Sequence, residues 1–182
     1  MLARRGQWWL ASHIHIRVME KHNNDDKGFQ GECMSSREQR VDERRTVTRE
    51  LIDKLLAERR EMLVLFCQVA GLEPYHRSAA LDQILQTFCQ VLIDYTAFGH
   101  FEVFGRISDG NERRGAVVQM AEKLYPDFVQ ASEAAVAFND KYDLSDHALV
   151  LDELSDDLSR LGEELAVRIE LEDQLLACML AR

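Results

Sequence analysis

Apolar residues recur at three- and four-residue intervals along four stretches of the chain, which is the spacing of an amphipathic α-helix. The first stretch begins after Thr46 and ends at Gly71 and Pro74, residue types that stop a helix. The second begins near Ser78 and is closed by residues 108–111, which read SDGN. The apolar positions are Leu51, Leu55, Met62, Leu65 and Val69 in the first stretch and Leu81, Leu85, Phe88, Leu92 and Tyr95 in the second.

The third and fourth stretches continue the same pattern. Their apolar positions are Val117, Ala121, Leu124, Phe128, Ala131, Ala135, Phe138 and Tyr142 in the third and Leu151, Leu154, Leu158, Leu161 and Leu165 in the fourth. Pro126 lies inside the third stretch and predicts a kink, because proline lacks the backbone donor and its ring clashes with the preceding turn. The fourth helix is expected from about Ser145 to the end of the chain. Four long amphipathic helices with short loops predict an all-α fold, an up-down-up-down four-helix bundle.

The inner faces of the second and fourth predicted helices turn polar near their C-terminal ends. The residues at these positions are Asp94, Gly99 and Glu102 on the second helix, with Asp94 along its apolar face, and Arg168 and Glu172 on the fourth. A buried charge costs several kcal/mol unless it is paired. These groups are therefore expected either to line a polar crevice toward one end of the bundle or to pair with each other across it.

Residues 1–33 differ from the rest of the chain. A short apolar patch with Trp8 and Trp9 is followed by a polar tract, and the segment lacks the small-residue cleavage site of a secretory signal. We expect residues 1–33 to be a disordered or extraneous extension and residues 34–182 to form a single helical-bundle domain, with Met34 as a candidate translation start. The alternative is a genuine but mobile extension.

The net charge of −10 argues against direct binding to nucleic acid or to an anionic membrane surface, since both would repel the chain. The acids are concentrated between Asp140 and Asp173, where twelve Asp and Glu face three basic residues. A run of charge is often a solvated helix face and nothing more. As a binding feature, it suits a basic partner.

The four cysteines indicate a reducing compartment. Cys33, Cys67, Cys89 and Cys178 show no C-x-x-C spacing, and three of them lie in apolar helical runs. No stretch approaches the roughly 20 apolar residues that span a bilayer. A cytoplasmic protein is therefore expected.

The motifs of bundle enzymes are not found in the sequence. A di-iron centre uses Glu-x-x-His spacings on two helices, and the spacing here runs from Glu73 to His76 across the proline of a loop. Asp143 and His147 fit a helix cap better than a metal site. There is no G-x-S-x-G elbow and no phosphate-binding glycine-rich loop. We therefore expect no enzyme, no metal and no cofactor, with a metal-binding or small-molecule-sensing bundle as the alternative.

Four segments resemble the Rsd/AlgQ family of bacterial anti-sigma transcription regulators. They are ELIDKLLAERREML (50–63), FCQVLIDYTAFGHFEVF (88–104), AVAFNDKYD (135–143) and RIELEDQLL (168–176), in the order of the family. One departure is visible: the family's D-R-W-L pattern reads Asp53-Lys54-Leu55-Leu56 here, so its aromatic residue is absent. A contact that depends on that aromatic residue is therefore not expected for this chain.

The resemblance implies an anti-sigma factor that binds region 4 of the primary (housekeeping) sigma factor. Binding would keep sigma from core RNA polymerase and from the promoter −35 element, and the sigma-bound protein is expected to be a monomer. Region 4 is a helix-turn-helix module that must be basic to meet DNA phosphates, so an acidic bundle complements it.

Asp94 matches the acid of the family's L-V-D-Y motif, and we expect it to accept a hydrogen bond from a basic side chain of sigma. Gly99 would permit a close backbone approach. The full set of expected partner-binding residues is Asp53, Asp94, His100, Phe101, Glu102, Arg168, Glu172 and Asp173.

Overall fold

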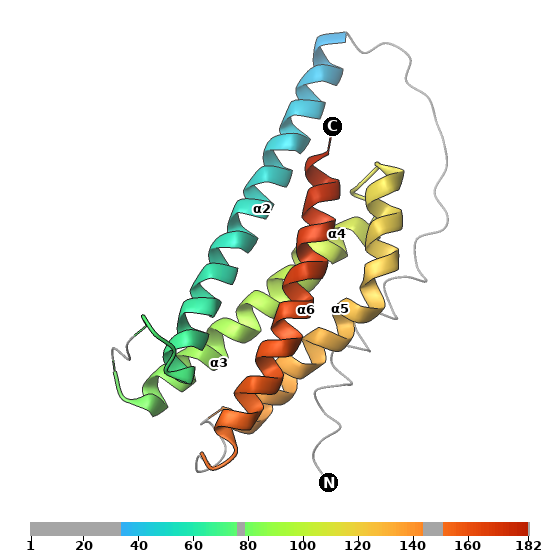
Figure 1. Cartoon of the computed structure of the whole chain (residues 1–182). Coiled ribbons are helices and arrows are strands. Elements are labelled where there is room, and N and C mark those ends of the chain that lie inside the picture. The colour runs from blue at the N-terminus through green and yellow to red at the C-terminus, as the bar shows by residue number, and fades with distance from the viewer. Residues whose placement is uncertain (1–33, 76–78, 144–150, 182) are drawn as a thin grey trace. The chain divides into compact units, whose positions relative to one another are not determined.

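The computed structural model describes residues 34–75, 79–143 and 151–181. Its elements are α2 (Met34–Ala70), α3 (Leu81–Phe98), the π-helix η1 (Gly99–Phe104), α4 (Gly105–Ser108), α5 (Gly115–Tyr142) and α6 (Leu154–Leu180). These residues contain no strand, so the all-α prediction is confirmed (Figure 1).

The chain divides into two compact units, residues 1–53 and residues 54–182. The helix α2 begins in the first unit and ends in the second. The expected extension, residues 1–33, lies outside the described residues, and the predicted domain of residues 34–182 stays a prediction. Within the first unit, the side chains from Glu43 to Glu50 are exposed or half-buried. The second unit contains the buried residues that are described below.

The successive long helices of the second unit run in opposite directions. Residues further toward the C-terminus of one long helix contact residues further toward the N-terminus of the next. The pairs are Lys54 with Phe98 and Phe66 with Phe88, then Phe88 with Phe138 and Phe104 with Phe128, then Lys141 with Asp157 and Ser132 with Arg168. The ion pair of Arg59 with Glu172 joins α2 to α6. The up-down-up-down order predicted from the sequence is confirmed.

Two glycines end helices where the sequence predicted ends. Gly71 has a φ of 69°, and its N–H donates to the carbonyl of Gln68 while the N–H of Leu72 donates to that of Cys67. This pair of bonds satisfies carbonyls that the last helical turn leaves without partners. Gly110, with a φ of 74°, ends α4 in the same way. Glycine suits both positions because it carries no penalty at positive φ.

Two predictions about the helices need correction or addition. The predicted fourth helix is not continuous through residues 151–153, and α6 begins at Leu154: Leu151 is 41% exposed and Leu154 is 6% exposed, so the buried stripe begins at the later residue. Residues 144–150 lie outside the described residues. Pro126 is inside α5, and Figure 1 shows α5 changing direction along its length. The π-helix η1 was not predicted, and it carries part of the candidate site.

Candidate functional site

Arg168 on α6 is a fully buried charge at the polar end of the fourth stripe. Its Nη1 donates to the hydroxyl of Ser132 on α5, and its Nη2 donates to the carbonyl of Thr96 on α3 at 3.1 Å. Its guanidinium carbon lies 4.1 Å from the ring centroid of Phe128 and 5.1 Å from that of Tyr95. Arg168 therefore joins α6 to α3 and α5 at once.

Glu172, one turn further along α6, is the acid that accompanies Arg168. Its Oε1 lies 3.0 Å from the Nε of Arg168. Its Oε2 accepts hydrogen bonds from the hydroxyl of Tyr95 at 2.7 Å and from Arg59 on α2 at 2.9 Å. The side chain is 2% exposed, so these partners take the place of the water that the carboxylate loses on burial.

Arg59 connects this cluster to the surface. Its Nη1 donates to the carboxylate of Asp173 at 2.6 Å, and the side chain of Asp173 is 59% exposed. The cluster then contains the guanidinium groups of Arg59 and Arg168 and the carboxylates of Glu172 and Asp173, and their formal charges cancel. We call Arg59, Tyr95, Arg168, Glu172 and Asp173 the polar core cluster.

The charged residues of the fourth stripe, Arg168 and Glu172, thus pair with each other and, through Glu172, with Arg59 of α2, whereas Asp94 and Glu102 of the second stripe are exposed and do not join the cluster. Arg59 was missed, although its signal was present: it stands four residues after Leu55 and three before Met62, in the apolar stripe of α2. The same kind of stripe interruption drew attention to Arg168. Tyr95 was assigned to the core without a partner, because its hydroxyl is satisfied by a residue 77 positions away.

Gly99 lies against the polar core cluster. A Cβ atom on this residue would be 2.7 Å from Nη2 of Arg168 and 3.3 Å from Oε1 of Glu172. A distance below 3.0 Å is not tolerated without movement. A side chain at position 99 would therefore force the guanidinium of Arg168 to move, whereas the backbone of Gly99 has the ordinary helical φ of −58° and does not itself need glycine.

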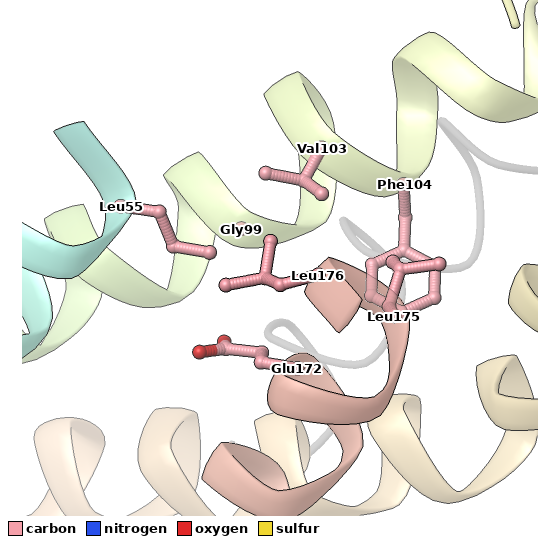
Figure 2. A pocket seen from close by; sticks show the side chains of 7 residues that line it. All are labelled: Leu55, Gly99, Val103, Phe104, Glu172, Leu175 and Leu176. Atoms are coloured by element: carbon pink, nitrogen blue, oxygen red, sulfur yellow. The ribbon is translucent and has the colours of Figure 1, made fainter. Parts of the chain in front are cut away.

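A small hollow lies beside Gly99 (Figure 2). It is lined by Leu55, Gly99, Val103, Phe104, Glu172, Leu175 and Leu176 and is too small to hold a ligand. Glu172 supplies the one carboxylate among these residues, and the other lining side chains are apolar. The polar crevice expected from the sequence stays a prediction.

His100, the second residue of η1, is 4% exposed. Its ring lies among three aromatic side chains, with Phe128 at 6.2 Å, Tyr125 at 5.8 Å and Phe101 at 5.0 Å between ring centroids. Nε2 lies 3.5 Å from the Tyr125 hydroxyl, and Nδ1 is buried without a hydrogen-bond partner. Burial lowers the pKa of His100 to about 4, and the charge of Arg168 contributes to the decrease. The imidazole is therefore neutral at pH 7.

The prediction that Asp94 lies along the apolar face of its helix is wrong, because Asp94 does not lie on the buried face of α3. Its side chain is exposed, and both carboxylate oxygens accept hydrogen bonds from Gln90 at 3.1 Å. Two residues turn an α-helix by about 200°, which places Asp94 almost opposite the fully buried Leu92. The carboxylate is therefore accessible to another molecule.

Asp94 faces the flank of α2. Glu58 on α2 is partly buried, and burial raises the pKa of its carboxyl; Lys54 opposes that rise and Asp94 adds to it. The Nζ of Lys54 lies 3.7 Å from Glu58 and 4.3 Å from the ring centroid of Phe98. Phe98 is half-buried, so this flank offers two carboxylates beside an aromatic ring.

Phe101 and Glu102 are both exposed on η1, with Phe101 at 37%. Asp53 is exposed on α2 and is the last residue of the first unit. Of the predicted site residues in the second unit, Asp94, Phe101, Glu102 and Asp173 are thus on the surface, and His100, Arg168 and Glu172 are buried.

Among residues 34–75, 79–143 and 151–181, no group of three or more His, Cys, Asp and Glu side chains is arranged to hold a metal ion. Glu73 is described, whereas His76 and His147 lie outside the described residues. Within the same described segments, no helix has the length and apolarity needed to cross a membrane.

Comparison with known proteins identifies the family. Residues 34–180 match the family described as Regulator of RNA polymerase sigma(70) subunit, Rsd/AlgQ. Proteins named Regulator of sigma D from Yersinia enterocolitica and Yersinia pseudotuberculosis are 34% identical over 133 residues, which cover 70% of this chain and 78% of each relative. The Regulator of sigma D of Escherichia coli is 33% identical over 137 residues, 71% of this chain and 84% of the relative. No solved structure matches the chain significantly. The chain belongs to the Rsd/AlgQ family of regulators of the RNA polymerase sigma(70) subunit.

Proposed function

We propose that this protein is an anti-sigma factor that binds region 4 of the primary sigma factor. Binding keeps sigma from core RNA polymerase and from the promoter −35 element, and the protein binds as a monomer. The family and the name Regulator of sigma D carried by its relatives support a sigma partner. The net charge of −10 supports a basic module of sigma, and a helix-turn-helix that contacts DNA phosphates is such a module.

The observation that carries the proposal is the accessible carboxylate of Asp94. Its hydrogen-bond partner, Gln90, belongs to the same helix, and a side-chain amide of this kind is replaceable by a charged donor. Glu58 and the half-buried ring of Phe98 lie nearby and are contacted by Lys54, for which a long basic side chain of sigma would substitute. An arginine or lysine of region 4 would therefore find charge and packing at one place.

The other predicted residues take two roles in this proposal. Phe101 and Glu102 contact sigma directly from η1, and Asp53 and Asp173 add exposed negative charge. His100, Arg168 and Glu172 are buried, so they act from beneath this surface.

Replacement of Asp94 by Asn tests the proposal. The variant keeps the size of the side chain and removes the charge, and a charge-assisted hydrogen bond contributes about 1.5 to 3 kcal/mol, so affinity for isolated region 4 should fall on the order of tenfold or more. Calorimetric titration measures this affinity. Asp127→Asn is the matched control, because Asp127 is an exposed aspartate on a different helix, α5.

Two results of the binding measurement would contradict the proposal or part of it. Equal affinities of wild type, Asp94→Asn and Asp127→Asn would remove Asp94 from the interface. Failure of the wild-type protein to bind region 4 at all would overturn the proposed function. Stoichiometric iron or zinc in the purified protein would instead support the metal-binding alternative.

A further inference from the structure

The π-helix η1 keeps a line of residues buried that an α-helix would rotate away. Tyr95, Gly99, Val103 and Ile107 are all buried and are each four residues apart. In an α-helix a step of four residues advances by about 40°, so three steps would turn Ile107 about 120° from Tyr95. In η1 the N–H of Gly105 donates to the carbonyl of His100, five residues earlier, which corrects this drift.

The carbonyl of Thr96 lies in the last turn of α3, just before η1 begins at Gly99. It shares the N–H of Gly99 with the carbonyl of Tyr95, and it accepts a further hydrogen bond from the Nη2 of Arg168. The guanidinium is itself fixed by Ser132, Glu172 and the ring of Phe128. Arg168 of α6, which these three groups hold in place, therefore donates a hydrogen bond to the last turn of α3.

The space for this donor exists because residue 99 has no side chain. Nη2 of Arg168 occupies the position next to a Cβ at residue 99, at 2.7 Å. Alanine at this position and the observed guanidinium position are mutually exclusive. The contact of Arg168 with Thr96 and the glycine at position 99 thus form one arrangement.

We propose that Arg168 is a positioning residue for the partner-binding surface, and that Gly99 is the residue that admits it. Arg168 holds the start of η1 in the register that buries His100 and exposes Phe101 and Glu102. This inference rests on the proposed function, since it assigns Arg168 a role behind the surface that meets sigma. It also predicts a property of η1 that does not depend on sigma.

The first test replaces Gly99 by Ala. The new methyl group displaces Arg168 from Thr96, so affinity for isolated region 4 should fall by up to about tenfold, because binding must then restore the register of η1 that the lost hydrogen bond held. Gly115→Ala is the matched control, because a Cβ at Gly115 has no atom within 4 Å. Circular dichroism checks that both variants keep their helix content. Wild-type affinity of Gly99→Ala would overturn the inference.

The second test uses Arg168→Lys, which keeps the charge and lacks the Nη2 atom. Lysine cannot donate to Ser132 and Thr96 with the geometry of the guanidinium fork, so this variant should also bind region 4 more weakly. The double variant Gly99→Ala/Arg168→Lys should bind about as well as Arg168→Lys alone, because the alanine then meets no Nη2. Effects of the two substitutions that simply add would contradict a shared arrangement.

Amide hydrogen exchange gives the readout that is independent of sigma. Exchange of residues 99–104 should become faster in Gly99→Ala and in Arg168→Lys, while the amides near the C-terminal end of α5, where α5 contacts α6 through Lys141 and Asp157 and not through Arg168, keep their wild-type rates. Uniformly faster exchange would indicate general destabilisation and would refute a positioning role, as would unchanged exchange in η1. If the wild-type protein fails to bind region 4, the proposed function is wrong, and the exchange experiment still decides the role of Arg168.

Discussion

Arg59 of α2 and Glu172 of α6 form an ion pair of 2.9 Å in which the side chains are 10% and 2% exposed. Each charge depends on the other, because neither has access to enough water to be solvated alone. Glu172 also holds the hydroxyl of Tyr95 and lies beside Arg168, so the pair connects three helices. A charged residue in an apolar stripe of this protein therefore marks a contact between helices.

Replacement of Arg59 by Ala should destabilise the protein. It leaves the carboxylate of Glu172 with one buried cation, Arg168, in place of two, so the loss should be smaller than the about 3 to 5 kcal/mol that breaking an isolated buried pair costs. Urea unfolding followed by circular dichroism measures the free energy of unfolding. Arg60→Ala is the control, since Arg60 is the next residue of α2 and is exposed. A loss equal to that of the control would show that the pair adds nothing to stability.

Replacement of Tyr95 by Phe removes one hydroxyl from the polar core cluster. The hydroxyl donates to Glu172 at 2.7 Å, and a hydrogen bond to a charged group contributes about 1.5 to 3 kcal/mol. We expect a loss of unfolding free energy within that range in the same urea experiment, with the aromatic packing kept. An unchanged midpoint and slope would indicate that water replaces the hydroxyl.

His100 should make the stability depend on pH. Its folded pKa of about 4 lies below the ordinary 6.5, so the unfolded chain binds the proton first as the pH falls. The stability contributed by the neutral ring is complete above pH 6.5 and is lost between pH 6.5 and pH 4, by on the order of 3 kcal/mol in total. Urea unfolding at several pH values should show a steeper loss over this window in wild type than in His100→Phe. Parallel curves would contradict the assignment to His100.

Cys89 should be the least reactive of the described thiols. It is buried, and burial raises the pKa of its thiol to about 12, so the reactive thiolate is absent at pH 8. Cys67 and Cys178 are partly exposed. Alkylation followed by peptide mass spectrometry should label these two in the native protein and Cys89 after unfolding. Labelling of Cys89 at the same rate as Cys67 would disprove the prediction.

The helices could be predicted because each apolar stripe is a local pattern. The ends at Gly71 and Gly110 could also be predicted, since a residue type that accepts positive φ is visible in the sequence. Arg168 and Glu172 were found as interruptions of a stripe. Their partners could not be predicted, because the pairing of Arg59 with Glu172 depends on the faces that two distant helices present to each other.

The π-helix η1 could not be distinguished from an α-helix by its sequence pattern. The four-residue spacing from Tyr95 through Gly99 and Val103 to Ile107 is compatible with either kind of helix over a short length. For Asp94, the prediction of a place along the buried face was wrong, because its side chain is exposed. Its separation of two residues from the buried Leu92 already directs it away from the stripe, so the helical pattern alone could have given the correct placement.

Binding to region 4 should weaken as salt is added. The acidic protein and a basic helix-turn-helix attract each other over a distance that screening reduces to about 8 Å at physiological ionic strength, so the association rate should fall steeply between low and high salt. Stopped-flow mixing at several salt concentrations measures the rate. Asp94→Asn should reduce both the rate at low salt and its dependence on salt, whereas a substitution that removes a buried hydrogen bond and no charge, such as Tyr95→Phe, should leave the dependence unchanged. An association rate that is independent of salt would refute electrostatic recognition of a basic partner.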